Sequence, residues 1–266
     1  MLKDFILEKI KSAIVETEPF SHIIIPDFLP ESYIKDFSNL PNYHDIDENV
    51  YFQDLKHSKK SIADNNPDKS NYKSLLDTYD KFNDFDKICK ENNELKNVIF
   101  EKFSNELKAH LNQDYKSFNT STSLNYSVSI PGYSKEIHVD RREHLINILL
   151  YVSEDNESAN LHLWKEKNVN DVCDVFPSSN ELTLSKTYSP KRNTAVIMIN
   201  LPWAYHSVDE QKKNFLNRKY IYVVFDFEKT DRNDTKHDNN QSIIWKKKVE
   251  VLNSERRHNF LNLINN

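Results

Sequence analysis

Glycine occurs once in this sequence of 266 residues, at Gly132. Glycine adopts a left-handed backbone at the least cost, so other residue types must occupy nearly all the turns that require this conformation. Asparagine and aspartate tolerate it best among the remaining residues, and we expect them to take these positions. We interpret the scarcity of glycine as a compositional bias, which by itself argues against no fold.

Cysteine is also rare, with Cys89 and Cys173 as the two examples. Neither lies in a spacing typical of metal sites, and two cysteines in a chain of this size favour a reducing compartment, so we expect a cytoplasmic protein. No apolar run reaches the length of about 18 residues that a transmembrane helix needs, and residues 1–16 lack the features of a signal peptide. The net charge of −5, from 36 basic and 41 acidic residues, argues against general nucleic-acid binding.

What the sequence does contain is the motif His138-Val139-Asp140, followed much later by His206 and by the basic residue Arg218. A His-x-Asp motif is weak on its own, because about one is expected by chance in a chain with ten histidines. Two histidines and one carboxylate on separate elements are, however, what a non-haem Fe(II) site requires, with one face of the metal left open.

Short apolar runs surround these residues and give the motif its context. They are too short to span a membrane and are rich in the aliphatic residues of buried strands. Turn signals follow the first run at Pro131-Gly132 and precede a later one at Pro190. The order is strand, His-x-Asp, strand, strand, loop, strand, His, and a last strand that begins with Arg. The runs cover residues 124–130, 145–152, 161–164, 195–199 and 220–225.

This order resembles the 2-oxoglutarate- and Fe(II)-dependent dioxygenases, and specifically their prolyl-4-hydroxylase-like branch. The resemblance covers residues 19–227 and is densest from residue 124 onward. It rests on the segments IPGYSKEIHVD, LINILLYVSED, NLHLW, SPKRNTAVIMI, YHSV and RKYIYVVF, and on PFSHIIIPDFLPESYIKDF near the start. It implies a mainly β fold with flanking helices, of the α+β class, around a double-stranded β-helix (jelly-roll) core.

Three positions depart from the family pattern. Ala159-Asn160 stands where the family has two glycines before the third strand, and Asn193 stands where it has a glycine after a proline turn. Asparagine at these positions preserves the turns if it adopts the left-handed conformation. The interval between His206 and Arg218 is slightly long, so Lys219 is an alternative for the role of Arg218.

The resemblance implies two cofactors, Fe(II) and 2-oxoglutarate as co-substrate. His138, Asp140 and His206 would hold the iron. Arg218 would bind the far carboxylate of 2-oxoglutarate, because its planar guanidinium suits a paired contact. Three tyrosines are candidates to support that carboxylate: Tyr220 and Tyr222 share the strand parity of Arg218, and Tyr126 lies on the strand before the motif.

Four further residues are candidates for the substrate site. Arg141 and Arg142 follow Asp140 and would lie at the mouth of the substrate site, where they either bind an anionic substrate or remain solvated. Trp203 and Tyr205 precede His206 and either form a wall of the substrate site or belong to the core. The sequence does not identify the substrate, which is either a peptide or a small molecule. The candidates are a prolyl residue in a peptide, a free amino acid, a sugar or lipid-linked intermediate, and a nucleobase.

Outside the motifs, we expect one integrated domain with three regions: a helical and strand region at 1–123, the catalytic core at 124–228, and a linker with a C-terminal helix at 229–266. Apolar periodicity predicts an amphipathic helix within residues 1–16. The polar residues 41–94 should form loops and then a helix over 70–92, supporting the sheet or covering the iron. We also expect a helix over 94–111, a long loop over 165–189, and a helix over 243–264 that packs on the core or on a second copy of the chain.

Two other functions compete with an active oxygenase. The chain could be a catalytically silent binding or scaffold protein on the same fold, or a cupin-type metal enzyme that does not use 2-oxoglutarate. An intact set of three metal ligands with a basic residue in the co-substrate position favours the oxygenase, since loss of function would tend to damage one of the four. The basic residue also disfavours the cupin-type enzyme.

Overall fold

The computed structural model describes residues 1–47, 52–53, 57–111, 116, 120–141, 144–154, 158–168, 176–214 and 216–227. The expected linker and C-terminal helix over 229–266 lie outside these residues, as does the proposed contact of that helix with a second copy. Within the described residues, no helix is long and apolar enough to cross a membrane.

A seven-stranded antiparallel sheet forms the larger half of the core, with the strand order β1-β9-β6-β11-β4-β3-β2. Its central strands coincide with the apolar runs seen in the sequence, because strands buried on both faces are apolar at nearly every position. The strands are β1 (His22–Ile25), β2 (Phe52–Gln53), β3 (Lys59–Ala63), β4 (Thr120–Ser129), β6 (His144–Tyr151), β9 (Thr194–Ile199) and β11 (Arg218–Phe227).

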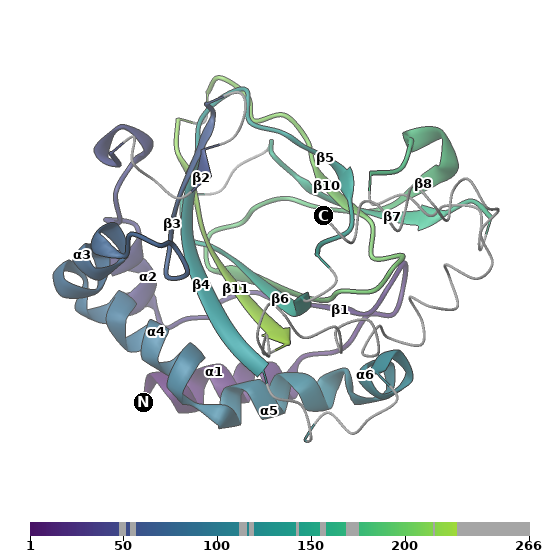
Figure 1. Ribbon diagram of the computed structural model, residues 1–266, viewed down its shortest axis with the longest axis horizontal. Coiled ribbons are helices and arrows are strands. Elements are labelled where there is room, and N and C mark those ends of the chain that lie inside the picture. Colours follow the sequence, from purple (N-terminus) through teal and green to yellow (C-terminus); the bar gives the residue numbers. More distant parts are fainter. Residues whose placement is uncertain are drawn as a thin grey trace.

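A four-stranded antiparallel sheet with the order β5-β10-β7-β8 forms the smaller half and faces the larger one (Figure 1). From β4 onward the chain passes back and forth between the two sheets, with β7 and β8 as the one consecutive pair of described strands in the same sheet, so the expected jelly-roll core with flanking helices is confirmed. The strands of this sheet are β5 (Lys135–His138), β7 (Leu161–Glu166), β8 (Leu182–Tyr188) and β10 (His206–Val208).

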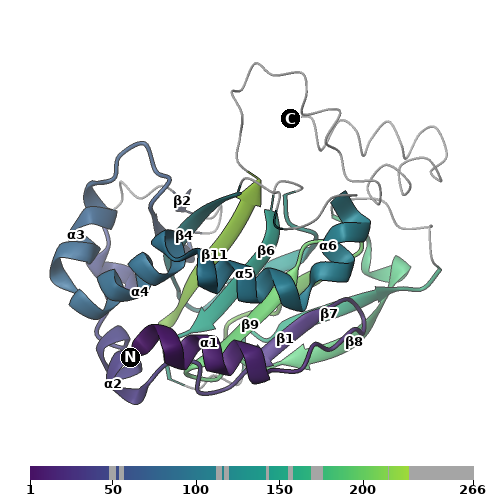
Figure 2. The same ribbon diagram turned by 90° about the horizontal axis from the view of Figure 1, so that it is seen from below.

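Helices cover the outer face of the larger sheet, and α1 and α5 lie across it in Figure 2. Outward-facing residues such as Ile148 and Ile221 belong to one hydrophobic core that also includes helix residues, and the ring of Phe100 packs edge-on against Phe225. The helices are α1 (Leu2–Ser12), α2 (Glu31–Phe37), α3 (Ser70–Thr78), α4 (Asp80–Glu91), α5 (Asn93–Lys102) and α6 (Ser104–Leu111), with 3-10 turns at Tyr43–Asp45 and Ser179–Glu181.

The N-terminal helix confirms the predicted amphipathic pattern, with Leu2, Ile6, Leu7 and Ile10 buried. The other expected helices differ from the prediction in their continuity. The segment 70–92 breaks at Tyr79, whose backbone leaves the helical region, and the segment 94–111 breaks at Phe103. Neither break is marked by glycine or proline, so the sequence carries no strong signal for it.

Strands also lie in two polar segments where we expected none. β2 and β3 fall in the segment 41–94, where β2 pairs with β3 and β3 pairs with β4 along the larger sheet. β8 falls in the segment 165–189, which we had expected to be a long loop, and pairs with β7. Most β8 side chains are exposed or half-exposed because it is an edge strand, so it lacks the apolar signature of its neighbours.

Left-handed backbone occurs at Gly132 and at four described residues of other types: Asp27, His57, Ala159 and Asn193. Asn193 confirms the expected replacement of glycine, with a φ of 61°. At the Ala159-Asn160 pair the expectation was wrong in detail, because Ala159 takes the positive φ of 56°.

Candidate metal centre

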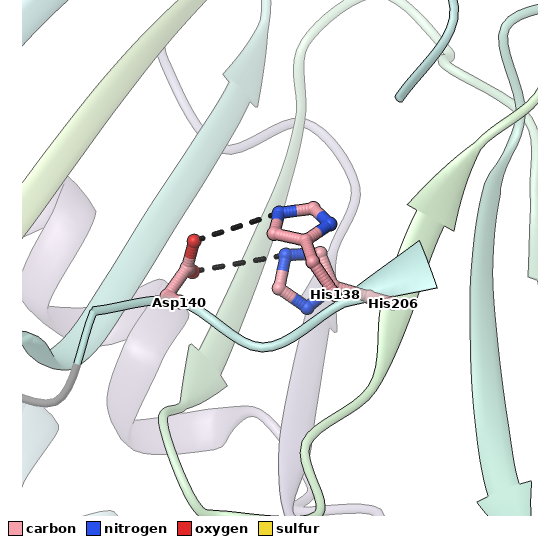
Figure 3. Close-up of side chains that lie close together, drawn as sticks. All are labelled: His138, Asp140 and His206. Atoms are coloured by element: carbon pink, nitrogen blue, oxygen red, sulfur yellow. Dashed lines mark ion pairs between the residues drawn. The ribbon is translucent and has the colours of Figure 1, made fainter. Parts of the chain in front are cut away.

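His138 and His206 are brought together by strand pairing in the smaller sheet. His138 is the last residue of β5 and His206 the first of β10, and the two are direct cross-strand partners. Their ring centroids lie 4.3 Å apart. Asp140 follows β5 by two residues and faces both rings (Figure 3), so one potential ligand atom from each of the three residues lies within 4.8 Å of the others.

Both imidazoles are oriented by the backbone. The Nδ1 atom of His138 lies 2.8 Å from the carbonyl oxygen of Glu136, and that of His206 lies 3.0 Å from the carbonyl oxygen of Ala204. A carbonyl oxygen only accepts hydrogen bonds, so Nδ1 carries the proton and Nε2 keeps a free lone pair. Each Nε2 lies 3.7 Å from an oxygen of Asp140.

The charge state of the cluster suits a metal ion. Burial, followed by the nearby His206, lowers the pKa of His138 to about 3. Burial on its own would raise the pKa of Asp140, but the charges of His206, His138 and His144 and the hydrogen bond from Tyr222 together lower it. The side chains of His138, Asp140 and His206 are 12%, 17% and 11% exposed, so the cluster is shielded from solvent and still reachable.

The larger sheet supports the carboxylate of Asp140 from the opposite side. The Oδ2 atom accepts hydrogen bonds from the amide of Asn147 on β6 and from the hydroxyl of Tyr222 on β11 at 3.1 Å. Burial, and then the charge of Asp140, raises the pKa of Tyr222 well above its usual value, so the hydroxyl keeps the proton that it donates. Tyr222, expected beside 2-oxoglutarate, therefore contacts Asp140, one of the three candidate metal ligands.

Arg218 lies on the same inward face of β11 as Tyr222, four residues away, or about 13 Å along the strand. It is 1% exposed, and its guanidinium lies over the rings of Tyr151 and Tyr220, 5.1 and 4.7 Å from their centroids. One hydrogen bond of 3.5 Å joins it to the Tyr151 hydroxyl, and its Nε has no partner among the described residues.

Lys219 and Tyr126 point to the opposite face of the sheet. The ammonium of Lys219 donates to the carbonyl oxygens of Ser38 and Leu40, at 2.8 and 2.6 Å. Tyr126 pairs in register with Ile221, on that same face, and its hydroxyl donates to the carbonyl oxygen of Pro41 at 2.5 Å. The structure thus separates these two residues from Arg218, and Tyr220 remains beside it.

The four substrate candidates have different surroundings. Arg141 is exposed and Arg142 lies outside the described residues. Trp203 is half-buried against the main hydrophobic core, and Tyr205 is 1% exposed. The structure brings Phe176, from the segment 165–189, against His138 instead, with the rings stacked at a centroid distance of 6.3 Å.

Two residues of this inward face were missed in the sequence. Asn147 is a buried polar residue in the apolar run of β6, and such a residue is the signal that could have identified it. Lys59 on β3 is aligned with Arg218 across β4, since both pair with Ser129. Its ammonium lies 5.4 Å from the centroid of Tyr220, the ring that Arg218 also contacts. Lys59 could not be placed because β3 was not recognised.

No known protein family and no curated protein matches this sequence. Solved structures do match it. A prolyl 4-hydroxylase from Phytophthora capsici is 12% identical with a TM-score of 0.53, over 98% of this chain and 77% of the other. A prolyl-4-hydroxylase from Pseudomonas putida is 12% identical with a TM-score of 0.47, over 86% of this chain and 100% of the other.

A prolyl hydroxylase from Trichoplax adhaerens, solved with a peptide fragment of a hypoxia inducible factor, is 10% identical with a TM-score of 0.42, over 85% of this chain and 89% of the other. Of these three structures, the one from Phytophthora capsici has a TM-score above 0.5, and this likeness shows that the chain has the fold of that prolyl 4-hydroxylase. It is the fold that the sequence motifs indicated.

Proposed function

We propose that this protein is an Fe(II)- and 2-oxoglutarate-dependent dioxygenase that hydroxylates a substrate and releases succinate and CO2. The observation that carries the proposal is the position of Arg218. It is a buried cation on the inward face of the larger sheet, the face from which Tyr222 donates to Asp140, with tyrosines and no described carboxylate in contact. A buried guanidinium without a counter-ion is unfavourable, so its place at this distance from the metal site favours an anionic ligand between the two.

The donor set fits the metal. Two neutral imidazoles and one carboxylate from three positions are the ligands of non-haem Fe(II) oxygenases, and they leave the remaining positions open. His138, Asp140 and His206 would hold the ion. The bound iron and 2-oxoglutarate would supply oxidative decarboxylation coupled to insertion of an oxygen atom into a C–H bond of the substrate.

The other residues bind and orient. Arg218 would pair with the far carboxylate of 2-oxoglutarate, and the rings of Tyr151 and Tyr220 hold the guanidinium in place. Leu149 pairs in register with Tyr222 and lies on the same face, level with the end of the site at Asp140. This apolar side chain would exclude water from the co-substrate and so strengthen the ionic contacts around it.

The competing functions differ in what they require of Arg218. A silent scaffold has no need of a buried cation on the face that supports Asp140, and a metal enzyme without 2-oxoglutarate has no need of a cation that binds its far carboxylate. We propose a small molecule or a peptide as the substrate, and a cytoplasmic location.

Binding of 2-oxoglutarate tests the proposal without knowledge of the substrate. Calorimetry on protein loaded anaerobically with Mn(II), a redox-stable substitute for Fe(II), should show 2-oxoglutarate binding that is absent without metal and absent in His206→Ala. With Fe(II) and ascorbate, candidate substrates should then raise succinate release in the wild type and not in the variant. Wild-type protein that binds Mn(II) and no 2-oxoglutarate would support the enzyme without 2-oxoglutarate, and protein that binds neither would support the scaffold.

A further inference from the structure

The carboxylate of Asp140 is held by two donors that come from outside its own sheet. Asp140 follows β5 of the smaller sheet, whereas Asn147 and Tyr222 lie on β6 and β11 of the larger one. The two donors are on adjacent strands, where Tyr222 pairs with Leu149 and Val224 with Asn147. Both hydrogen bonds end on the same oxygen, Oδ2.

The orientation of the Asn147 amide is fixed by chemistry. Its Nδ2 donates to Asp140, and its Oδ1 is buried with no partner among the described residues. Turning the amide over would place Oδ1, an acceptor, against a carboxylate that also only accepts. Leaving a buried carbonyl unsatisfied is unfavourable, so the contact between Nδ2 and Asp140 is maintained at a cost to stability.

We infer that Asn147 and Tyr222 are positioning residues that restrict Asp140 to a single coordinating oxygen, an inference that rests on the proposed metal centre. Oδ1 lies 3.7 Å from Nε2 of His138, and Oδ2 lies 3.7 Å from Nε2 of His206. Because two donors are enough to use both lone pairs of Oδ2, Oδ1 is the oxygen left to coordinate the metal. A carboxylate that coordinates through one oxygen leaves one more metal position open than a carboxylate that coordinates through two.

Metal affinity provides the test, because hydrogen-bond partners of metal ligands typically contribute about 10–100-fold to it. Tyr222→Phe removes the hydroxyl and keeps the ring, and Asn147→Leu removes the donor with little change in size. Each should raise the Kd for Mn(II), measured by electron paramagnetic resonance of the free ion, about 10–100-fold. Each should also alter the visible spectrum of the anaerobic Co(II) form, which reports coordination number.

Tyr220→Phe is the matched control. Tyr220 has the same side chain on the same face of the same strand, two residues away, but its ring lies against Arg218 and no described hydrogen bond joins it to Asp140. It should leave Mn(II) affinity and the Co(II) spectrum as in the wild type. Thermal melts would identify a variant that fails to fold; if Asn147→Leu does so, Tyr222→Phe decides alone.

The possible results separate the inference from the function on which it rests. Wild-type protein that binds Mn(II), together with folded variants of unchanged affinity and Co(II) spectrum, overturns the inference and leaves the metal centre intact. Wild-type protein that binds no divalent ion overturns the metal centre and the inference with it. Weaker binding in the Tyr220→Phe control, to the extent seen in Tyr222→Phe, also overturns the inference, because the effect would then not depend on contact with Asp140.

Discussion

Arg218 and Lys219 are adjacent cations that the strand directs to opposite faces. Arg218 lies over the rings of Tyr151 and Tyr220 on the inward face. Lys219 donates to the carbonyl oxygens of Ser38 and Leu40 on the outward face. Successive side chains of a strand point to opposite faces of the sheet. A shift of the register by one residue would therefore exchange the cation that is available to a ligand, Arg218, with the cation that stabilises a helix end, Lys219.

This difference gives a prediction for the co-substrate. Arg218→Ala should weaken binding of 2-oxoglutarate to the Mn(II)-loaded protein by about 10–100-fold, because a hydrogen bond to a charged group contributes about 1.5–3 kcal/mol. Arg218→Lys should have a smaller effect, since it keeps the charge and loses the planar pair of donors. Calorimetric titration measures both changes.

Lys219→Met serves as the control for this prediction. It should lower the melting temperature, because two buried carbonyl oxygens lose their donor, and should leave the affinity for 2-oxoglutarate unchanged. If Lys219→Met weakens 2-oxoglutarate binding as much as Arg218→Ala does, the assignment of the two cations is wrong.

At the level of residues, the sequence could predict the candidate metal ligands, because their spacing along the chain follows from the chemistry of such a site. The His-x-Asp spacing of His138 and Asp140 follows from one strand end, and His206 is placed by the order of strands. The role of Tyr222 could not be predicted, because its contact joins residues 82 positions apart across two sheets. The alternation of side chains along the strand placed Tyr222 on the correct face of the sheet, but it did not indicate that Asp140 is its hydrogen-bond partner.

Among the elements, predictability followed apolar composition. β6 and β9 are buried along nearly their whole length, and their apolar runs made them evident. β8 is an edge strand with polar, exposed residues, and β3 begins with two lysines. β3 and β8 are stabilised by pairing with a neighbouring strand, and such pairing cannot be recognised from the local amino-acid composition.

The turn before β9 depends on one asparagine and gives a prediction at this scale. Asn193 adopts a left-handed φ of 61°. Its side chain accepts from the backbone N–H of Leu29 at 2.9 Å and donates to the carbonyl oxygen of Leu29 at 2.8 Å. One residue therefore supports both the turn and the connection between β1 and α2.

Asn193→Gly and Asn193→Ala separate these two contributions. The glycine variant keeps the backbone conformation and loses both hydrogen bonds, so it should be destabilised by about 1–3 kcal/mol. The alanine variant also places a Cβ in the left-handed region and should be destabilised by about 1–2 kcal/mol more. Urea unfolding measures both free energies. Equal stability of the two variants would show that the backbone conformation at this turn carries no strain.

At the scale of the whole molecule, the two sheets are joined along one edge by a polar group around His22 at the start of β1. Its Nε2 lies 2.8 Å from the hydroxyl of Tyr188 on β8, and its Nδ1 lies 2.7 Å from the carbonyl oxygen of Phe20. Glu16 lies 3.9 Å from the same Nε2 and pairs with Lys186 of β8. An edge strand of each sheet therefore meets at a buried histidine.

The pH dependence of stability should report on this edge. Burial is the main cause that lowers the pKa of His22 below 6.5. The hydrogen bond to the Phe20 carbonyl and the charge of Glu16 act against it, and Lys186 acts in the same direction as burial. Below about pH 6.5 the unfolded chain therefore binds a proton that the folded protein does not, and stability is lost as the pH falls from there. His22→Gln cannot take up this proton. Urea unfolding at about pH 7.5 and about pH 5.5 should show a larger loss of stability in the wild type than in the variant. The same loss in both proteins would mean that His22 takes up its proton as readily in the folded state as in the unfolded one.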